Sequence, residues 1–120
     1  MALPRSRPRR VQTVTTEEVR WYRALLGLRP PDLPDAPVPA PLLVGLVWAA
    51  LRDDTLDGPA TVASLDTLVL GPLAPDEPFV IETVIESQSD RQARARLTVR
   101  ADRRLVLRAS AVLLRRAVAA

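Results

Sequence analysis

The side chains that could do chemistry in this chain are carboxylates, because the other common catalytic groups are missing. The 120 residues include no histidine, no cysteine and no lysine. Histidine transfers protons near neutral pH, cysteine is a strong nucleophile, and lysine forms Schiff bases. Acid–base chemistry is therefore left to 14 aspartates and glutamates, to Tyr22 and to backbone dipoles.

Two of these carboxylates, Asp32 and Asp35, lie in a proline-rich stretch and are the candidate catalytic residues. Burial in a pocket favours the neutral form of a carboxyl group, so either residue could act as a general acid or base. The alternative is a structural role, since aspartate in such loops commonly forms turns or caps helices. No metal or cofactor is expected, because His/Cys clusters are absent and the acidic group at 53–57 has no further ligands for calcium.

Composition predicts a single domain with a cytoplasmic location. Apolar residues make up 48% and charged residues 26%, as in an ordinary globular protein, and no apolar run reaches the ~18 residues of a membrane span. Four of the 17 basic residues lie within residues 1–10, and without them the formal charge falls from +3 to −1. We therefore expect a disordered basic tail at 1–10, a domain at 11–116 and a short tail at 117–120, with neither nucleic acid nor membrane as a partner.

The first part of the chain predicts a short strand and a capped helix. Residues 11–14 have strand character, and Thr15 with Glu18 three residues later forms a capping box. Apolar residues then recur at helical spacing up to Gly27, a typical C-terminal stop, which predicts a helix over 16–26.

The middle of the chain predicts a loop and then a buried helix. Residues 28–41 hold six of the twelve prolines and should form a connection, either functional or simply rigid. Residues 42–52 are apolar nearly all round, so a helix there must be buried on most sides. The aromatic residues Trp21, Tyr22 and Trp48 stand at core spacing in the two helices, which favours packing roles.

The rest of the chain predicts an antiparallel sheet. Strands are expected over 61–70, 79–87, 93–100 and 105–114, and the alternation of apolar residues with arginines in the third has a clean period of two. Short turns join the last three strands into a meander. One apolar helix and one such sheet predict an α+β fold in which the sheet wraps the helix, the hot-dog arrangement. Its open edge should pair with a second subunit.

Charged residues on the predicted strands allow two interpretations. Arg94, Arg96 and Arg100 share one strand face and could form a patch for a phosphate or a carrier protein. The preceding strand carries Glu82 and Glu86 at matching parity. Cross-strand pairing would make this a partly neutralised solvent face, which is the favoured interpretation.

The chain resembles the MaoC-like branch of the hot-dog superfamily, the R-specific enoyl-CoA hydratases and related dehydratases. The resemblance covers roughly residues 11–116 and rests on the order of features. The passages that carry it are VQTVTTEEVRWYRALLG, APLLVGLVWAAL, VLGPLAPDEPFVIETVIESQS and the closing strands LTVRADRRLVLRASAVLLRR.

The family's catalytic Asp/His pair is missing from this sequence. The family normally carries a Gly-Asp-x-Asn-Pro-x-His pattern between its two helices, and Gly27 and Pro31 keep their places here. Leu28 stands where the aspartate would be, and Leu33 stands where the histidine would be. Leucine can neither take a proton from water nor deliver one to carbon. The third passage also departs from the family, with Pro75-Asp76 in place of Pro-Gly-Asp.

The resemblance also implies a binding site at the start of the central helix. In the family, free N–H groups there point at the thioester carbonyl, and such donors with the helix dipole suit a developing oxyanion. Capping by solvent or loop carbonyls is the structural alternative. The implied substrate-binding residues are Leu42, Leu43, Val44 and Gly45, with Trp48 beside an acyl tunnel.

Three functions are compatible with these features. The first is a non-catalytic subunit, paired with a catalytic hot-dog homologue or with itself, that binds an acyl thioester on CoA or a carrier protein. The second is an enzyme that uses Asp32 or Asp35 and the helix-end dipole for dehydration or cyclisation in lipid, polyketide or other secondary metabolism. The third is a purely structural interaction domain without a cavity beside the central helix.

Overall fold

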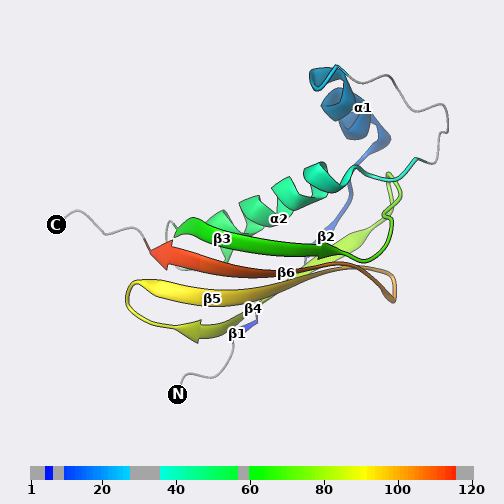
Figure 1. Ribbon diagram of the computed structural model, residues 1–120. Coiled ribbons are helices and arrows are strands. Elements are labelled where there is room, and N and C mark those ends of the chain that lie inside the picture. Colours follow the sequence, from blue (N-terminus) through cyan, green and yellow to red (C-terminus); the bar gives the residue numbers. More distant parts are fainter. Residues whose placement is uncertain (1–4, 7–9, 28–35, 57–59, 116–120) are drawn as a thin grey trace.

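The computed structural model describes residues 5–6, 10–27, 36–56 and 60–115 of the chain. Within them it has an α+β architecture in which one long helix lies along one face of an antiparallel sheet (Figure 1). The elements in chain order are β1 (Arg5–Ser6), β2 (Arg10–Gln12), α1 (Thr16–Leu25), α2 (Ala40–Asp54), β3 (Ala60–Val69), β4 (Phe79–Gln88), β5 (Gln92–Ala101) and β6 (Arg104–Arg115).

The sheet has the order β1-β4-β5-β6-β3, and β2 pairs with β4 beside β1. Every pairing is antiparallel, and the predicted meander is β4–β5–β6. Strand β3 pairs with β6 along one of its edges. Its other edge pairs with no strand among the described residues, so β3 is an edge strand of ten residues.

Strand β5 confirms the period of two that its sequence predicts. Its alanine, leucine and valine side chains at odd positions are buried, whereas the arginines between them are exposed. A tight connection leads into β5, where the Ser89 N–H donates to the Gln92 carbonyl at 2.7 Å. The connection to β6 runs through Asp102 at φ 57°, a left-handed conformation that aspartate tolerates better than most residues.

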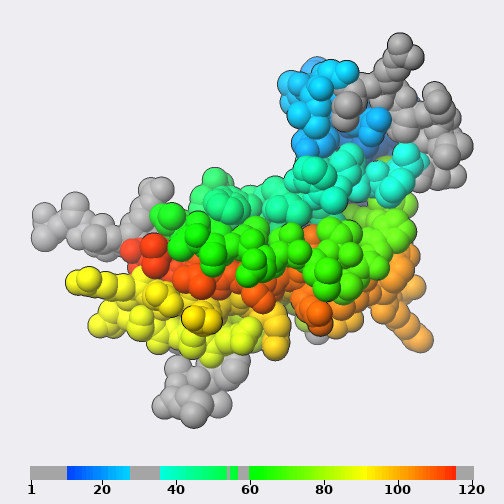
Figure 2. Space-filling view, viewed as in Figure 1, coloured from blue at the N-terminus to red at the C-terminus, as the bar shows by residue number. Residues whose placement is uncertain are grey.

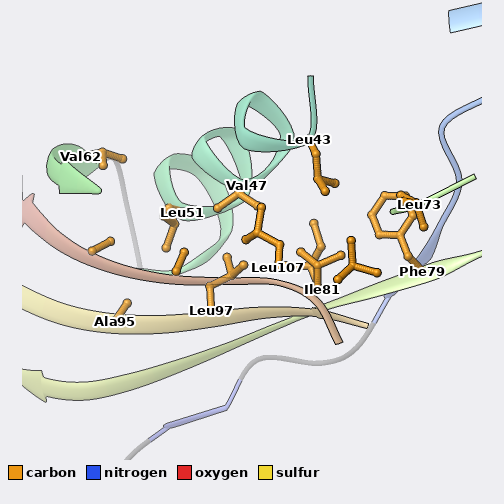
Figure 3. Packing of buried hydrophobic residues seen from close by; sticks show 14 of the residues in the cluster. Leu43, Val47, Leu51, Val62, Leu73, Phe79, Ile81, Ala95, Leu97 and Leu107 are labelled. Atoms are coloured by element: carbon orange, nitrogen blue, oxygen red, sulfur yellow. The ribbon is translucent and has the colours of Figure 1, made fainter. Parts of the chain in front are cut away.

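The core lies between α2 and the inner face of the sheet (Figure 3). From α2 come Leu43, Val47 and Leu51, which are at most 2% exposed. They face Leu97 on β5, Leu107 on β6 and a set of small residues on the same two strands, namely Ala93, Ala95, Ala109 and Ala111. Small side chains under the C-terminal half of the helix let it lie close to the sheet, so the predicted packing of an apolar helix on an antiparallel sheet is confirmed.

The burial of α2 is less complete than its composition predicts. Only one side of the helix is buried, and Pro41, Gly45 and Trp48, spaced four and three residues apart, are exposed. Trp48 is 43% exposed and Trp21 on α1 is 66% exposed, so the predicted core roles of these two tryptophans are wrong. Helical spacing alone does not say which face of an apolar helix has a partner within its own chain.

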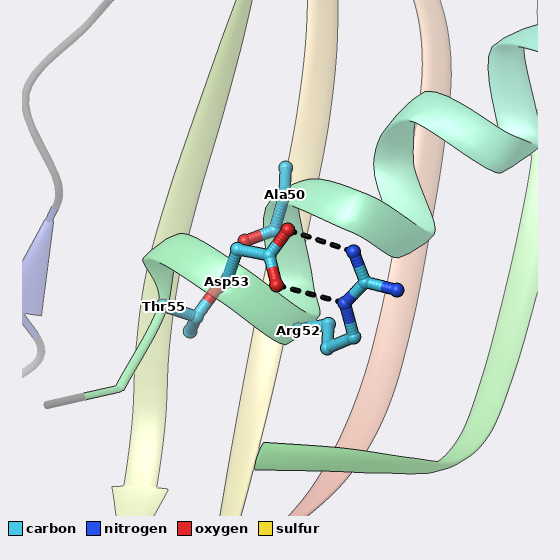
Figure 4. Close-up of polar contacts among 4 residues, drawn as sticks. All are labelled: Ala50, Arg52, Asp53 and Thr55. Carbon is cyan, nitrogen blue, oxygen red and sulfur yellow. Dashed lines mark hydrogen bonds and ion pairs between the residues drawn. The ribbon is translucent and has the colours of Figure 1, made fainter. Parts of the chain in front are cut away.

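Helix α2 also extends beyond the predicted 42–52 at both ends. Pro41 is inside its first turn, where the missing N–H of proline costs nothing. At the other end, the Arg52 guanidinium donates to both carboxylate oxygens of Asp53, at 2.7 and 2.9 Å (Figure 4). This pair lowers the pKa of Asp53 through the hydrogen bond. The Thr55 hydroxyl donates to the Ala50 carbonyl at 3.3 Å and helps to close the helix.

The N-terminal segment differs from the predicted tail and strand. Arg5 and Ser6 pair with Ile85 and Val84 of β4, so these two residues are a strand rather than part of a disordered tail. The strand expected at 11–14 lies at Arg10–Gln12. Backbone pairing with a free sheet edge depends little on side-chain type, which is why composition missed it. Residues 1–4, 7–9 and 117–120 of the predicted tails lie outside the described residues.

Candidate functional site

A pocket of about 550 Å³ lies at the N-terminus of α2. Its volume falls in the range of small-molecule sites. Four parts of the chain form its walls: the end of α1, the segment before α2, the first turn of α2, and the end of β3 with the residues after it. The described residues that line it are Arg23, Ala36, Pro37, Val38, Pro39, Ala40, Leu43, Val69, Leu70, Gly71, Pro72 and Leu73.

Backbone hydrogen bonds hold these walls together. The Val38 N–H donates to the Leu73 carbonyl at 2.7 Å, which joins the segment before α2 to the segment after β3. The N–H groups of Leu70 and Gly71 both donate to the Val106 carbonyl, at 2.8 and 3.3 Å. The pocket is therefore built on the end of the sheet, although two of its walls are irregular segments.

The donors at the start of α2 differ from the predicted ones. The N–H groups of Leu42 and Leu43 donate to the Pro39 carbonyl at 3.1 and 3.2 Å, because the helix begins two residues earlier than expected. The residues that follow are inside the helix. Pro41 has no N–H, so the first-turn donor left without an intrahelical acceptor is the N–H of Ala40, which lines the pocket.

The structure separates the predicted site residues into three groups. Leu43 lines the pocket and is buried. Leu42, Val44, Gly45 and Trp48 lie on α2 but are not among the described residues that line the pocket. Asp32 and Asp35 lie outside the described residues, and Ala36, the first described residue after them, lines the pocket.

Asp76 is a positioning residue, which the sequence analysis named only as a departure from the Pro-Gly-Asp turn of the family. It has φ 65°, and its N–H donates to the Val14 carbonyl at 2.7 Å. Its carboxylate accepts from the N–H and the hydroxyl of Thr16, at 3.3 and 2.7 Å, at the start of α1. The helix is also capped as predicted, because the Glu18 N–H donates to the Thr15 hydroxyl at 3.1 Å. Asp76 thus ties α1, and the pocket wall that α1 supplies, to the turn before β4.

Asp76→Gly should destabilise the protein by about 1–2 kcal/mol, because it removes the acceptor for the first turn of α1. Asp76→Ala should cost about 1 kcal/mol more, since alanine is strained at positive φ whereas glycine is not. Urea denaturation of the two variants measures both effects. Equal stability of Asp76→Ala and wild type would contradict this role.

Solved structures with a similar fold identify the architecture. An (R)-hydratase from A. caviae involved in PHA biosynthesis superposes with a TM-score of 0.77 at 15% identity, over 94% of this chain and 96% of that one. The ChsH1–ChsH2 complex of Mycobacterium tuberculosis gives 0.74 at 13% identity, covering 96% and 98%. The chain has the hot-dog fold. The HadBC (3R-hydroxyacyl-ACP dehydratase) complex of the same organism gives 0.69 at 14% identity, covering 94% and 95%.

Comparison of the sequence of this hot-dog chain with protein families and with curated proteins finds no match. No protein-family pattern matches it, and no curated protein matches it. The structural neighbours, at 13–15% identity, agree in fold with the predicted likeness to MaoC-like hydratases and dehydratases.

The turn beside the pocket of this hot-dog domain is held by an ion pair. The Arg104 guanidinium donates to Glu77 at 2.7 Å and to the Pro72 carbonyl at 3.1 Å. The Ala74 N–H donates to the same Glu77 oxygen at 3.1 Å. The hydrogen bond from Arg104, and then that from Ala74, lowers the pKa of Glu77 below its usual value.

This arrangement predicts a pH-dependent contribution to stability. Because the pKa of Glu77 is lower in the folded state, its contribution is present above the unfolded pKa of about 4.3 and is lost as the pH falls through the folded pKa. Glu77→Gln should therefore lower the free energy of unfolding at pH 7 by up to about 1 kcal/mol, and by less at pH 3. Asp90→Asn, in an exposed turn, is the control. A Glu77→Gln effect that is equal at both pH values would contradict the prediction.

The outer face of the sheet carries the charged residues that the sequence predicts there. The Arg100 guanidinium lies 3.9 Å from the Glu82 carboxylate, both partly exposed. A bulge in β4 shifts Glu86, so that Arg94 lies opposite Ser87. Arg94 and Glu86 instead line a shallow polar hollow of about 210 Å³ with Asp66 and Ser110. Acidic and basic groups are mixed on this face, in agreement with the favoured interpretation.

In the part of the chain that the structure describes, no three or more acidic, histidine or cysteine side chains gather where they could bind a metal ion. Neither of its two helices has the length and apolar character needed to cross a bilayer.

Proposed function

We propose that this chain is a non-catalytic hot-dog subunit that pairs with a histidine-bearing homologue and contributes a wall of a shared acyl-thioester pocket. The observation that carries the proposal is the combination of a pocket at the N-terminus of α2 with the absence of histidine from all 120 residues. Hydration of an enoyl thioester needs groups that transfer protons, and the described pocket lining contains neither a carboxylate nor a histidine.

The surface of the chain supports pairing with a second subunit. One edge of strand β3 pairs with no strand among the described residues, and the apolar residues Leu68 and Val69 at its end and Leu70 just after it are exposed. Atoms of α2 and β3 lie side by side on the face that Figure 2 shows. Helix α2 also carries an exposed stripe formed by Pro41, Gly45 and Trp48. A free strand edge next to exposed apolar side chains is the usual basis for a continuous sheet across two subunits.

The second subunit could be a histidine-bearing homologue or another copy of this chain. The neighbours include two complexes of named hot-dog chains, HadBC and ChsH1–ChsH2. We propose a heterodimer because a second copy would bring no histidine to the shared pocket.

Co-expression with a histidine-bearing hot-dog homologue tests the proposal. Native mass spectrometry should show a 1:1 complex, and the homologue should hydrate enoyl thioesters faster in the complex than alone. Failure to form any heterodimer, with homodimers of this chain only, would contradict the heterodimer proposal.

The second candidate function is a catalyst in its own right that uses Asp32 or Asp35. One observation favours it: Asp35 directly precedes Ala36, a pocket-lining residue. If a carboxylate carries the proton, Asp32→Asn or Asp35→Asn should reduce the dehydration or cyclisation rate of the isolated chain by about 10²–10⁴. Unchanged turnover in both variants would exclude these residues as proton carriers.

A further inference from the structure

The polar hollow of about 210 Å³ on the outer face of the sheet holds acidic and basic groups that do not pair with one another. Its charged lining residues are Asp66, Glu86 and Arg94, all exposed, and Ser64 and Ser110 add hydroxyl groups. None of the three charged side chains makes an ion pair or a side-chain hydrogen bond with another described residue. The hollow therefore presents charges of both signs to a ligand.

The register of the sheet keeps these charges apart. Glu86 lies on β4 next to β5, but the bulge in β4 places Ser87 opposite Arg94. Asp66 lies on β3, and β6 runs between β3 and β5. At about 4.8 Å for each strand, the backbones that carry Asp66 and Glu86 are about 14 Å apart. The short side chain of Ser110 lies opposite Asp66, so the middle of the hollow stays open.

The charges of the hollow favour one class of ligand. Two carboxylates and one guanidinium are balanced by a ligand that carries two cationic groups and one carboxylate. A phosphate would meet both acidic residues as well as the single guanidinium, and this repulsion disfavours it. The hollow is smaller than the about 300–1,000 Å³ of typical small-molecule pockets, which limits the ligand to a small metabolite.

We propose that the hollow binds a small basic amino acid, with its carboxylate on Arg94 and its two ammonium groups on Asp66 and Glu86. The planar guanidinium presents paired N–H donors that match both oxygens of a carboxylate. The residues on either side of Arg94 in β5, Ala93 and Ala95, have side chains buried in the core with α2, so the hollow is on the opposite face of the sheet. The site is therefore separate from the pocket at the N-terminus of α2 and does not depend on the proposed function.

Titration of the isotopically labelled full chain with L-lysine, cadaverine and L-norleucine, followed by NMR at low ionic strength, tests the proposal. Cadaverine lacks the carboxylate of lysine, and norleucine lacks its second ammonium group. Lysine should bind at least about tenfold more tightly than either probe, because each probe loses one charge-assisted hydrogen bond. The largest changes in backbone chemical shift should fall on the residues of β3, β5 and β6 that line the hollow.

Variants of two arginines on the same strand face separate a site from general surface charge. Arg94→Gln should weaken lysine binding at least about tenfold and should not weaken cadaverine binding, since cadaverine has no carboxylate to lose. Arg96→Gln is the matched control, because Arg96 is also exposed on β5 but is not among the described residues that line the hollow. It should leave the dissociation constant of lysine within about threefold of wild type.

Results with the wild type alone can overturn the proposal: no lysine binding at millimolar concentration, equal affinity for the three probes, or shift changes confined to another part of the chain. The test therefore does not depend on how well a variant folds. Unchanged lysine affinity in Arg94→Gln, or an equal loss in Arg96→Gln, would also contradict it. Failure to form a heterodimer would overturn the proposed function and leave this inference standing.

Discussion

Replacing Trp48 by aspartate should weaken subunit pairing by at least about 30-fold in Kd. Trp48 is 43% exposed, and together with Pro41 and Gly45 it forms the exposed stripe of α2. Tryptophan at the centre of an interface commonly contributes 2 kcal/mol or more, and an aspartate there would have to lose its hydration. Analytical ultracentrifugation over a concentration series measures the change, with the heterodimer or with the chain alone.

Trp21→Asp is the matched control for this prediction. Trp21 is even more exposed, at 66%, but lies on α1, away from the proposed α2–β3 surface. It should leave the dissociation constant within about threefold of wild type. Equal loss of pairing in both variants, or no loss in Trp48→Asp, would show that the subunits meet elsewhere.

Leu51→Ala should destabilise the protein by about 2–5 kcal/mol. Leu51 is fully buried between α2 and the sheet, and truncation would leave a cavity over the small alanines of β5 and β6. Such a loss is a large part of the 5–15 kcal/mol that stabilises a typical domain. Chemical denaturation followed by circular dichroism gives the free energy of unfolding.

Leu25→Ala is the control, because Leu25 is 81% exposed on α1. It makes the same chemical change and should alter stability by no more than about 0.5 kcal/mol. A loss below 1 kcal/mol for Leu51→Ala would mean that α2 is not the helix on which the core is built.

Much of the fold could be predicted from local pattern. The alternation in β5, the capping box at Thr15–Glu18 and the apolar run of α2 each reflect a backbone period or a defined hydrogen bond. Element ends were less predictable, because Pro41 is compatible with either side of a helix start. The strand at Arg5–Ser6 was missed because it depends on a free edge of β4, which is distant in sequence.

The candidate site was less predictable than the fold. The sequence pointed to the start of the central helix, and Leu43 does line the pocket there. The contact that Asp76 makes was missed because it joins α1 to the turn before β4. Arg23 was missed as a pocket-lining residue because the fold brings the end of α1 and the end of β3 to the same pocket. The signal that could have found Asp76 is its place in a Pro-rich turn, where positive φ favours Asp, Asn or Gly.

The rate of enoyl-thioester hydration is the most direct test of the central claim that this chain supplies no proton-transferring residue. The loss of absorbance of crotonyl-CoA should be at background with the purified chain alone and rapid with the heterodimer. Replacing the catalytic histidine of the homologue should abolish turnover of the complex, whereas Asp32→Asn and Asp35→Asn in this chain should not. Turnover by the chain alone, lost in either of these two variants, would contradict the claim.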